Sequence, residues 1–196
     1  MVRNAKLPAT ALNPPNTFLM NPEFSISPAT TAHIQIISRL AYEIWPETYH
    51  FLPEGQVNFM LAEMYSPAAL TRQISEQNQQ FLLLRHQNQP IGFASFTASA
   101  ETKTAKLNKL YLLPAWHGKN LGKLLLKEVE AQAAKTGCNT LNLNVNRHNP
   151  AFNFYKSAGF AVVQEEDIPI GPYFMNDYVL QKPLTPANQP KNKLSV

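Results

Sequence analysis

Apolar and polar residues alternate along the chain with two periods, one typical of helices and one typical of strands. Ile34, Ile37 and Leu40 have the spacing of one helix face, whereas residues 140–145 alternate as a strand does. Helices are predicted over 30–43, 53–65, 66–76, 121–135 and 149–159, and strands over 24–27, 81–84, 91–98, 106–113, 140–145, 160–163 and 178–181. This order, with helices first and strands alternating with helices later, predicts an α/β fold with a mixed sheet.

Local signals indicate where several of these elements begin and end. Ser66-Pro67 has the form of a helix N-cap followed by the first helical residue, and Asn149-Pro150 has the same form. Gly137 is expected to end the helix that begins at Leu121, because glycine adopts the left-handed conformation common after a helix.

The two ends of the chain lack this patterning. Residues 1–22 and 183–196 are rich in proline, so we expect flexible tails on either side of one domain over 23–182. Of the 196 residues, 44% are hydrophobic, which is enough for a substantial core. No apolar run reaches the roughly 18 residues of a membrane helix, and no secretory signal precedes the first prolines. We therefore expect a cytoplasmic protein with no membrane partner.

Cysteine and histidine usage argues against a metal centre. Cys138 is the only cysteine, which excludes a disulfide framework and a zinc site with several thiolates. The five histidines lack the spacing of paired metal ligands. No metal cofactor is expected.

Charge is distributed unevenly, although the net charge is only +4. Residues 101–159 contain nine basic and three acidic residues. Residues 30–80 contain two basic and five acidic residues, and residues 160–181 contain four acidic and no basic residues. This division favours an anionic ligand beside the basic region and a cationic ligand beside the acidic ones. The alternative is a set of ordinary solvated surfaces. No recognition-helix pattern accompanies the basic region, so no nucleic acid partner is expected.

A glycine-containing loop joins a predicted strand to the helix that begins at Leu121. Gly118 and Gly122 permit close approach of a ligand to the backbone, and the helix N-terminus offers unpaired N–H groups to an anion. Lys119 and Lys123 add positive charge, so the loop is suited to a pyrophosphate. The glycine spacing matches neither a Walker A loop nor a dinucleotide fingerprint. The alternative is a turn with solvated lysines.

A second segment, residues 144–160, combines the end of a strand, polar residues and a short helix. Tyr155 lies inside this helix, and a tyrosine hydroxyl is acidic enough to reprotonate a thiolate. The alternative is that Tyr155 is an aromatic core residue beside Phe152 and Phe154.

Together, the two segments resemble the GCN5-related N-acetyltransferase (GNAT) superfamily, over about residues 24–182. The family's loop pattern Arg/Gln-x-x-Gly-x-Gly/Ala aligns with His117, Asn120 and Gly122, of which Gly122 matches. The second segment matches the family at Asn149, Ala151, Phe154, Tyr155, Gly159 and Phe160. The resemblance implies an α/β fold with a mixed, mostly antiparallel sheet, a splay between the fourth and fifth strands, and flanking helices.

The resemblance also implies acetyl-CoA as the co-substrate. Its pantetheine arm would pair with the backbone at Leu112 and Leu113 and would contact Asn149. Tyr155 would protonate the leaving thiolate, in a direct transfer to an amine without a covalent enzyme intermediate. Asn108 stands where many members carry a glutamate that acts as the general base, so no general base is identified in this chain. The pyrophosphate would lie on the loop formed by His117, Gly118, Lys119, Asn120, Leu121, Gly122 and Lys123.

The expected acceptor is a small cationic amine of the polyamine or amino-sugar type, because the regions that build the acceptor pocket in this family are acidic here. Residues 170–182 also resemble the ending of bacterial spermidine/spermine N-acetyltransferase-like members. Two alternatives stay open, namely acetylation of a protein lysine or N-terminus and a non-catalytic acyl-CoA-binding module. The oligomeric state is open as well, with a homodimer as one alternative.

Overall fold

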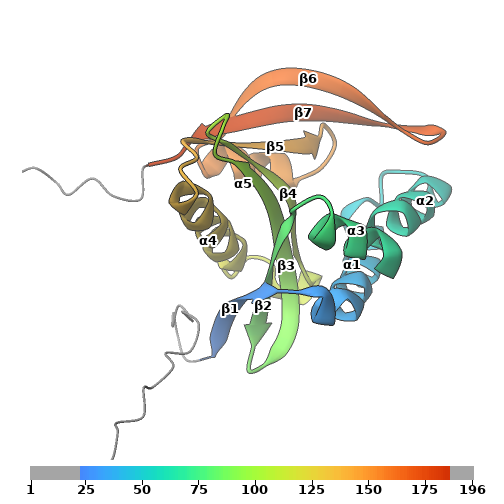
Figure 1. Cartoon of the computed structure of the whole chain (residues 1–196). Coiled ribbons are helices and arrows are strands. Elements are labelled where there is room, and N and C mark those ends of the chain that lie inside the picture. The colour runs from blue at the N-terminus through green and yellow to red at the C-terminus, as the bar shows by residue number, and fades with distance from the viewer. Residues whose placement is uncertain (1–22, 186–196) are drawn as a thin grey trace, which may run out of the picture.

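The computed structural model describes residues 23–185, which form a seven-stranded sheet with helices on both sides (Figure 1). The strand order is β1-β2-β3-β4-β5-β7-β6. All neighbouring strands are antiparallel except β4 and β5, which are parallel. The predicted α/β class with a mixed, mostly antiparallel sheet is therefore confirmed. The tail residues 1–22 and 186–196 lie outside the described residues.

Each helix and strand predicted from the sequence pattern is present. The strands are β1 (Phe24–Ala29), β2 (Gln80–His86), β3 (Gln89–Ser99), β4 (Thr104–Leu112), β5 (Thr140–Asn146), β6 (Ala161–Ile170) and β7 (Tyr173–Pro183). The helices are α1 (Ile34–Thr48), α2 (Glu54–Tyr65), α3 (Pro67–Ser75), α4 (Leu121–Lys135) and α5 (Ala151–Ser157), with short 3₁₀ turns η1 (Thr31–His33) and η2 (Pro114–Trp116).

Two hydrophobic clusters pack on opposite sides of the sheet. One contains Leu125 of α4, Leu143 of β5 and Tyr155 of α5, and we call this side the α4 face. The other contains residues of α1 and α2, such as Ile37 and Met60, and we call this side the α1 face. Figure 1 shows α4 on one side of the sheet and α1, α2 and α3 on the other. Because alternate residues of a strand point to opposite faces, the central strands contribute to both clusters.

Cap residues stabilise the helix ends near the predicted positions. The Ala69 N–H donates to Ser66 Oγ at 3.4 Å at the start of α3. Gly137 follows the last turn of α4 with a φ of +86°, as expected. Asn149 lies one residue further from α5 than a regular N-cap does. Its Oδ1 nevertheless accepts a hydrogen bond of 2.9 Å from the N–H of Ala151, the first residue of α5.

The β6–β7 hairpin is longer than the sequence pattern predicts. Strands are expected over 160–163 and 178–181, but β6 continues to Ile170 and β7 begins at Tyr173. Most residues of β6 are exposed, so no apolar alternation marks this strand. It is an edge strand, and the antiparallel hydrogen-bond ladder with β7 holds it.

Two other elements extend past their expected ends. The domain was expected to end at residue 182, but β7 includes Pro183, and Leu184 is buried in the cluster on the α4 face. The first helix was expected to end at residue 43, but α1 continues through Pro46 to Thr48. A proline interrupts a helix by removing one N–H donor, and here the following turn stays helical.

Candidate active site

The sheet opens between β4 and β5. The two strands pair only over Thr104–Leu107 and Thr140–Leu143, and beyond these residues they diverge. At this point Asn108 is an extra residue in β4, because consecutive residues of β3 lie opposite Lys109 and Leu107. An extra residue of this kind bends a strand and increases its twist. The expected splay between the fourth and fifth strands is therefore present.

A cavity of about 570 Å³ occupies this opening, and its lining comes from both faces of the sheet. The loop before α4 and the helix α5 line it on one side, and the end of α1 lines it on the other. Most of the residues expected to bind the co-substrate or to act in catalysis line the cavity: Leu112, His117, Gly118, Asn120, Leu121, Gly122, Lys123, Asn149 and Tyr155. Leu113 and Lys119 do not, and the Lys119 Nζ lies 4.5 Å from the Trp116 ring centre.

The backbone of β4 presents polar groups to the opening. The Leu113 N–H donates to the Ile91 carbonyl of β3 at 2.9 Å, so this group is directed away from the splay. Because N–H and C=O groups alternate in direction along a strand, those of Leu112 and Leu110 point into the splay. The Leu112 carbonyl accepts a hydrogen bond from His117 Nε2 at 3.0 Å. This bond ties the loop to the edge of the opening.

The loop before α4 contains two residues in the left-handed region of backbone conformation. Gly118 and Asn120 both have positive φ, at +75° and +59°. A Cβ atom at Gly118 would meet no other atom within 4 Å, so open space adjoins this backbone. The Leu124 N–H bonds to the Asn120 carbonyl at 3.1 Å. The N–H groups of residues 121–123 precede this first helical bond and have no helical partner.

Tyr155 has both of the properties that the sequence leaves as alternatives. Its ring is buried against Phe154 and Phe160, with centroid distances of 5.1 and 5.7 Å. The residue also lines the cavity. Burial raises the pKa of the hydroxyl above its ordinary value, so the hydroxyl is protonated at neutral pH. A protonated tyrosine at the cavity wall can donate a proton to a thiolate. A thiolate that forms in a dry site is poorly solvated and therefore binds this proton more strongly.

Sequence reasoning missed two further tyrosines of the cavity. The hydroxyl oxygens of Tyr49 and Tyr111 lie 3.2 Å apart, and both residues line the cavity. Burial raises the pKa of each hydroxyl, and charge on the nearby Tyr155 would raise both further. Tyr49 follows α1 and Tyr111 lies in β4, so no local motif unites them. The one available signal was the position of Tyr111 near the end of the strand that forms the splay.

Lys109 of β4 lines the cavity, but its amine is buried against aromatic rings. Its side chain is buried, with Nζ 5.1 Å from the centre of the Tyr65 ring and 5.8 Å from that of Phe81. Burial lowers the pKa of its amine to about 8. None of the ion pairs among residues 23–185 involves Lys109. This pKa still leaves the amine mostly protonated at neutral pH, so Lys109 retains positive charge on the α1 face.

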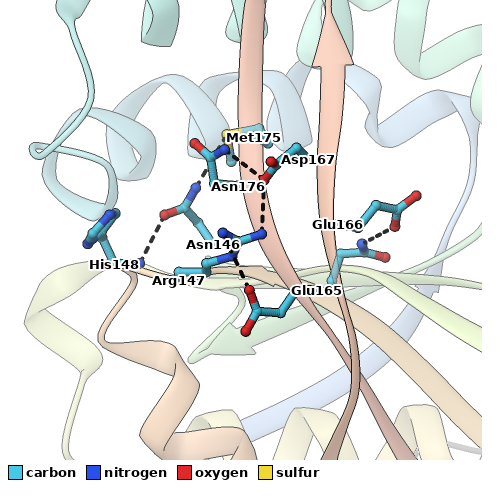
Figure 2. Close-up of polar contacts among 9 residues, drawn as sticks. Asn146, Arg147, His148, Glu165, Glu166, Asp167, Met175 and Asn176 are labelled. Atoms are coloured by element: carbon cyan, nitrogen blue, oxygen red, sulfur yellow. Dashed lines mark hydrogen bonds and ion pairs between the residues drawn. The ribbon is translucent and has the colours of Figure 1, made fainter.

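The acidic residues of β6 divide between the two faces of the sheet. Glu165 and Asp167 lie on the α4 face, where both pair with Arg147 at N–O distances of 3.6 and 2.9 Å (Figure 2). Glu166 is directed away from them, toward the α1 face, and accepts a hydrogen bond from Asn144 Nδ2 at 3.3 Å. Of these three neighbouring acids of β6, Glu166 alone therefore lies on the face that carries the end of α1.

Asp177 of β7 lies directly opposite Glu166 and is 6% exposed. Its Oδ1 atom has no hydrogen-bond partner among the residues that the structure describes. Burial, and to a smaller extent the charge of Glu166, raises the pKa of the carboxyl from 3.8 to about 6. The ionised form of this side chain is therefore less stable in the folded protein than in water.

Replacing Asp177 by asparagine is expected to stabilise the fold near neutral pH by about 1–2 kcal/mol, allowing for solvent screening. Because the pKa of Asp177 is higher in the folded protein, this group makes its full contribution to wild-type stability below pH 3.8, which is its pKa in the unfolded chain. It is lost as the pH rises to about 6. Urea unfolding across this range measures the effect, and the variant should lack this loss. Lower stability of the variant at neutral pH would contradict the prediction.

Two structural features are absent from residues 23–185. No helix in this range is long and apolar enough to cross a membrane. Nowhere in the same range do three or more His, Cys, Asp or Glu side chains gather as they would around a metal ion.

A sheet opened between two parallel strands, with a glycine loop and a buried tyrosine at the opening, is the arrangement of an N-acetyltransferase. The chain belongs to the GNAT family, since it matches the acetyltransferase (GNAT) domain over residues 49–172. It is similar to an uncharacterized N-acetyltransferase from Mycobacterium bovis, with 31% identity over 133 residues, which are 67% of this chain and 84% of that protein.

Relatives with more specific names are also similar. A spermidine N(1)-acetyltransferase from Thermoplasma acidophilum is 30% identical over 155 residues, or 76% of this chain and 90% of that protein. The crystal structure of PaiA N-acetyltransferase from the same organism, in complex with coenzyme A, aligns with a TM-score of 0.70 and 30% identity. That alignment covers 82% of this chain and 98% of the other. The ribosomal-protein-S18-alanine N-acetyltransferase of Escherichia coli, at 18% identity and a TM-score of 0.64, shows the shared fold alone.

Proposed function

We propose that the protein transfers the acetyl group of acetyl-CoA directly to a small primary amine that carries positive charge. The observation that carries this proposal is the cavity through the splay, which is lined by Leu112, by the loop before α4 and by Tyr155. Two further observations support it. A similar structure contains coenzyme A, and a similar protein is named as a spermidine acetyltransferase.

The residues present fit acetyl-CoA as a co-substrate. The backbone groups of Leu110 and Leu112 face the splay, where an extended arm with amide groups can pair with β4 as an added strand does. Leu113 would have no part in this pairing, because its N–H is bonded to β3. The open space beside Gly118 and the unpaired N–H groups of residues 121–123 fit a pyrophosphate.

The chemistry requires a neutral attacking amine and a protonated leaving group. The amine nitrogen attacks the thioester carbonyl, a C–N bond forms, the C–S bond breaks, and Tyr155 Oη gives its proton to the sulfur. The proton lost from the amine passes to water, and Tyr155 is reprotonated from water. Asn108 is uncharged, and its Nδ2 donates to Thr97 Oγ1 at 3.4 Å, so it is not a base.

The charges on the α1 face favour a cationic acceptor. Glu47 lines the cavity at the end of α1. Glu166 accepts a hydrogen bond from Asn144, which also lines the cavity. Lys109 also lines the cavity and is mostly protonated at neutral pH, but its Nζ lies against the rings of Tyr65 and Phe81. A cationic amine is therefore attracted to this side of the cavity.

Acetyl-CoA is expected to raise the unfolding temperature, because a ligand that binds only the folded state stabilises it by mass action. With acetyl-CoA present, free thiol should appear only after an amine is added. The test is a thiol-release assay with spermidine, putrescine, glucosamine and a lysine-containing peptide. The proposal is contradicted if saturating acetyl-CoA leaves the unfolding temperature unchanged. Thiol release that is fastest with the peptide would indicate protein acetylation instead, and binding without acceptor-dependent release would indicate an acyl-CoA-binding module.

A further inference from the structure

Two carboxylates on the α1 face have no part in the chemistry described above. Glu166 of β6 and Asp177 of β7 are direct partners in the antiparallel ladder, so their side chains lie on the same face. Asn146 of β5 lies opposite Asp177 on its other side. Like charges directly opposite one another destabilise a sheet, so this pair needs a compensating cation.

Among the described residues, no Lys or Arg forms an ion pair with Asp177, although the charges of Lys106 and Arg147 lower its pKa slightly. The ion pairs among them join Arg147 to Glu165 and Asp167, and Lys182 to Glu130, and none involves Asp177. Asp177 is 6% exposed, and its Oδ1 accepts no hydrogen bond. Its pKa of about 6 still leaves the carboxyl mostly ionised at neutral pH. A buried, ionised carboxylate with an unbonded oxygen is costly unless a charged donor binds to it.

The carboxylate pair adjoins the acceptor side of the cavity. Asn144 lines the cavity and donates to Glu166 at 3.3 Å. The charge of Asp177 raises the pKa of Tyr49, which also lines the cavity. In the register of β5 and β7, Asn144 and Asp177 are diagonal neighbours, which places them about 7–8 Å apart. Glu166 and Asp177 therefore lie next to the cavity lining, although neither is itself among the lining residues.

We propose that Glu166 and Asp177 bind a second ammonium group of the acceptor, so that the enzyme selects diamines and polyamines over monoamines. This inference rests on the proposed function. One amine of the substrate occupies the cavity beside Tyr155, and another donates hydrogen bonds to the two carboxylates. The ammonium supplies the donor that Asp177 Oδ1 lacks, and its charge offsets the repulsion between the pair.

Putrescine and butylamine test this subsite, because they share a carbon chain and differ by one amine. In the wild type, kcat/KM is expected to be higher for putrescine by about tenfold or more. Glu166→Gln and Asp177→Asn should each remove most of this preference by raising KM for putrescine much more than KM for butylamine. Glu165→Gln is the matched control, since Glu165 is the adjacent residue of β6 but pairs with Arg147 on the α4 face. It should retain the full preference.

The outcomes separate this inference from the proposed function. Equal kcat/KM for the two amines in the wild type overturns the subsite while leaving acetyl transfer intact. A loss that is the same for both amines in Glu166→Gln and Asp177→Asn also overturns it, because a second ammonium is then not involved. A similar loss of preference in Glu165→Gln would show general charge steering and not a subsite. If neither of these amines nor any other small amine causes thiol release, the proposed function itself is contradicted.

Discussion

Replacing Tyr155 by phenylalanine is expected to lower kcat about 100-fold while leaving the affinity for acetyl-CoA unchanged. The substitution keeps the ring that packs on Phe154 and Phe160 and removes only the hydroxyl. The leaving thiolate then lacks its proton donor, whereas the groups that bind the co-substrate are still in place. Steady-state kinetics give kcat, and calorimetric titration with acetyl-CoA gives the affinity.

Tyr178→Phe is the control for this experiment. Tyr178 packs on Phe152 of α5 with ring centroids 5.0 Å apart and is not among the residues that line the cavity. It should lose a hydroxyl without losing activity. Wild-type turnover in Tyr155→Phe would show that Tyr155 is a core residue alone. If kcat fell equally in Tyr155→Phe and Tyr178→Phe, the loss would reflect a general destabilisation near α5 and not proton transfer by Tyr155.

Replacing Gly122 by valine is expected to weaken acetyl-CoA binding by about tenfold or more, with the fold retained. A Cβ atom at Gly122 would lie 3.6 Å from the Phe154 ring, which is ordinary van der Waals contact, so alanine fits here. The two methyl groups of valine extend further into the cavity and occupy space beside the N–H groups of the loop. Titration with acetyl-CoA measures the loss, and Gly122→Ala should show a smaller one.

The matched control for Gly122→Val is Ala134→Val. Ala134 lies in the same helix, α4, and is partly buried but does not line the cavity. It should show the small cost of a β-branched residue in a helix without any change in affinity. Wild-type affinity in a folded Gly122→Val protein would show that the pyrophosphate does not lie on this loop.

The parts of the site that local sequence predicts are those held by short-range backbone chemistry. The glycine loop and the helix after it depend on the positive φ of Gly118 and on the start of α4 a few residues later. The Asn149 cap lies just before α5, and Tyr155 lies within α5 a few residues later. Such signals need no knowledge of which strands are neighbours, so the sequence predicts them well.

The parts that local sequence does not predict depend on pairing between distant segments. Tyr49 and Tyr111 meet only because α1 packs beside β4. The separation of Glu166 from Glu165 and Asp167 depends on the register of β6, an exposed strand without an apolar pattern. Net charge by region therefore overstates the acidity of the α1 face, because it cannot assign neighbouring residues of a strand to opposite faces.

The extra residue at Asn108 affects how sequences of this family are best aligned. Before it, Leu107 faces α4, and after it the same face is reached by the even-numbered residues Leu110 and Leu112. Deleting Asn108 would leave Tyr111 on the α1 face but would remove the bulge, and with it the local bend of β4 at the splay. A one-residue gap here would therefore change the cavity far more than a longer gap in the turn between β2 and β3.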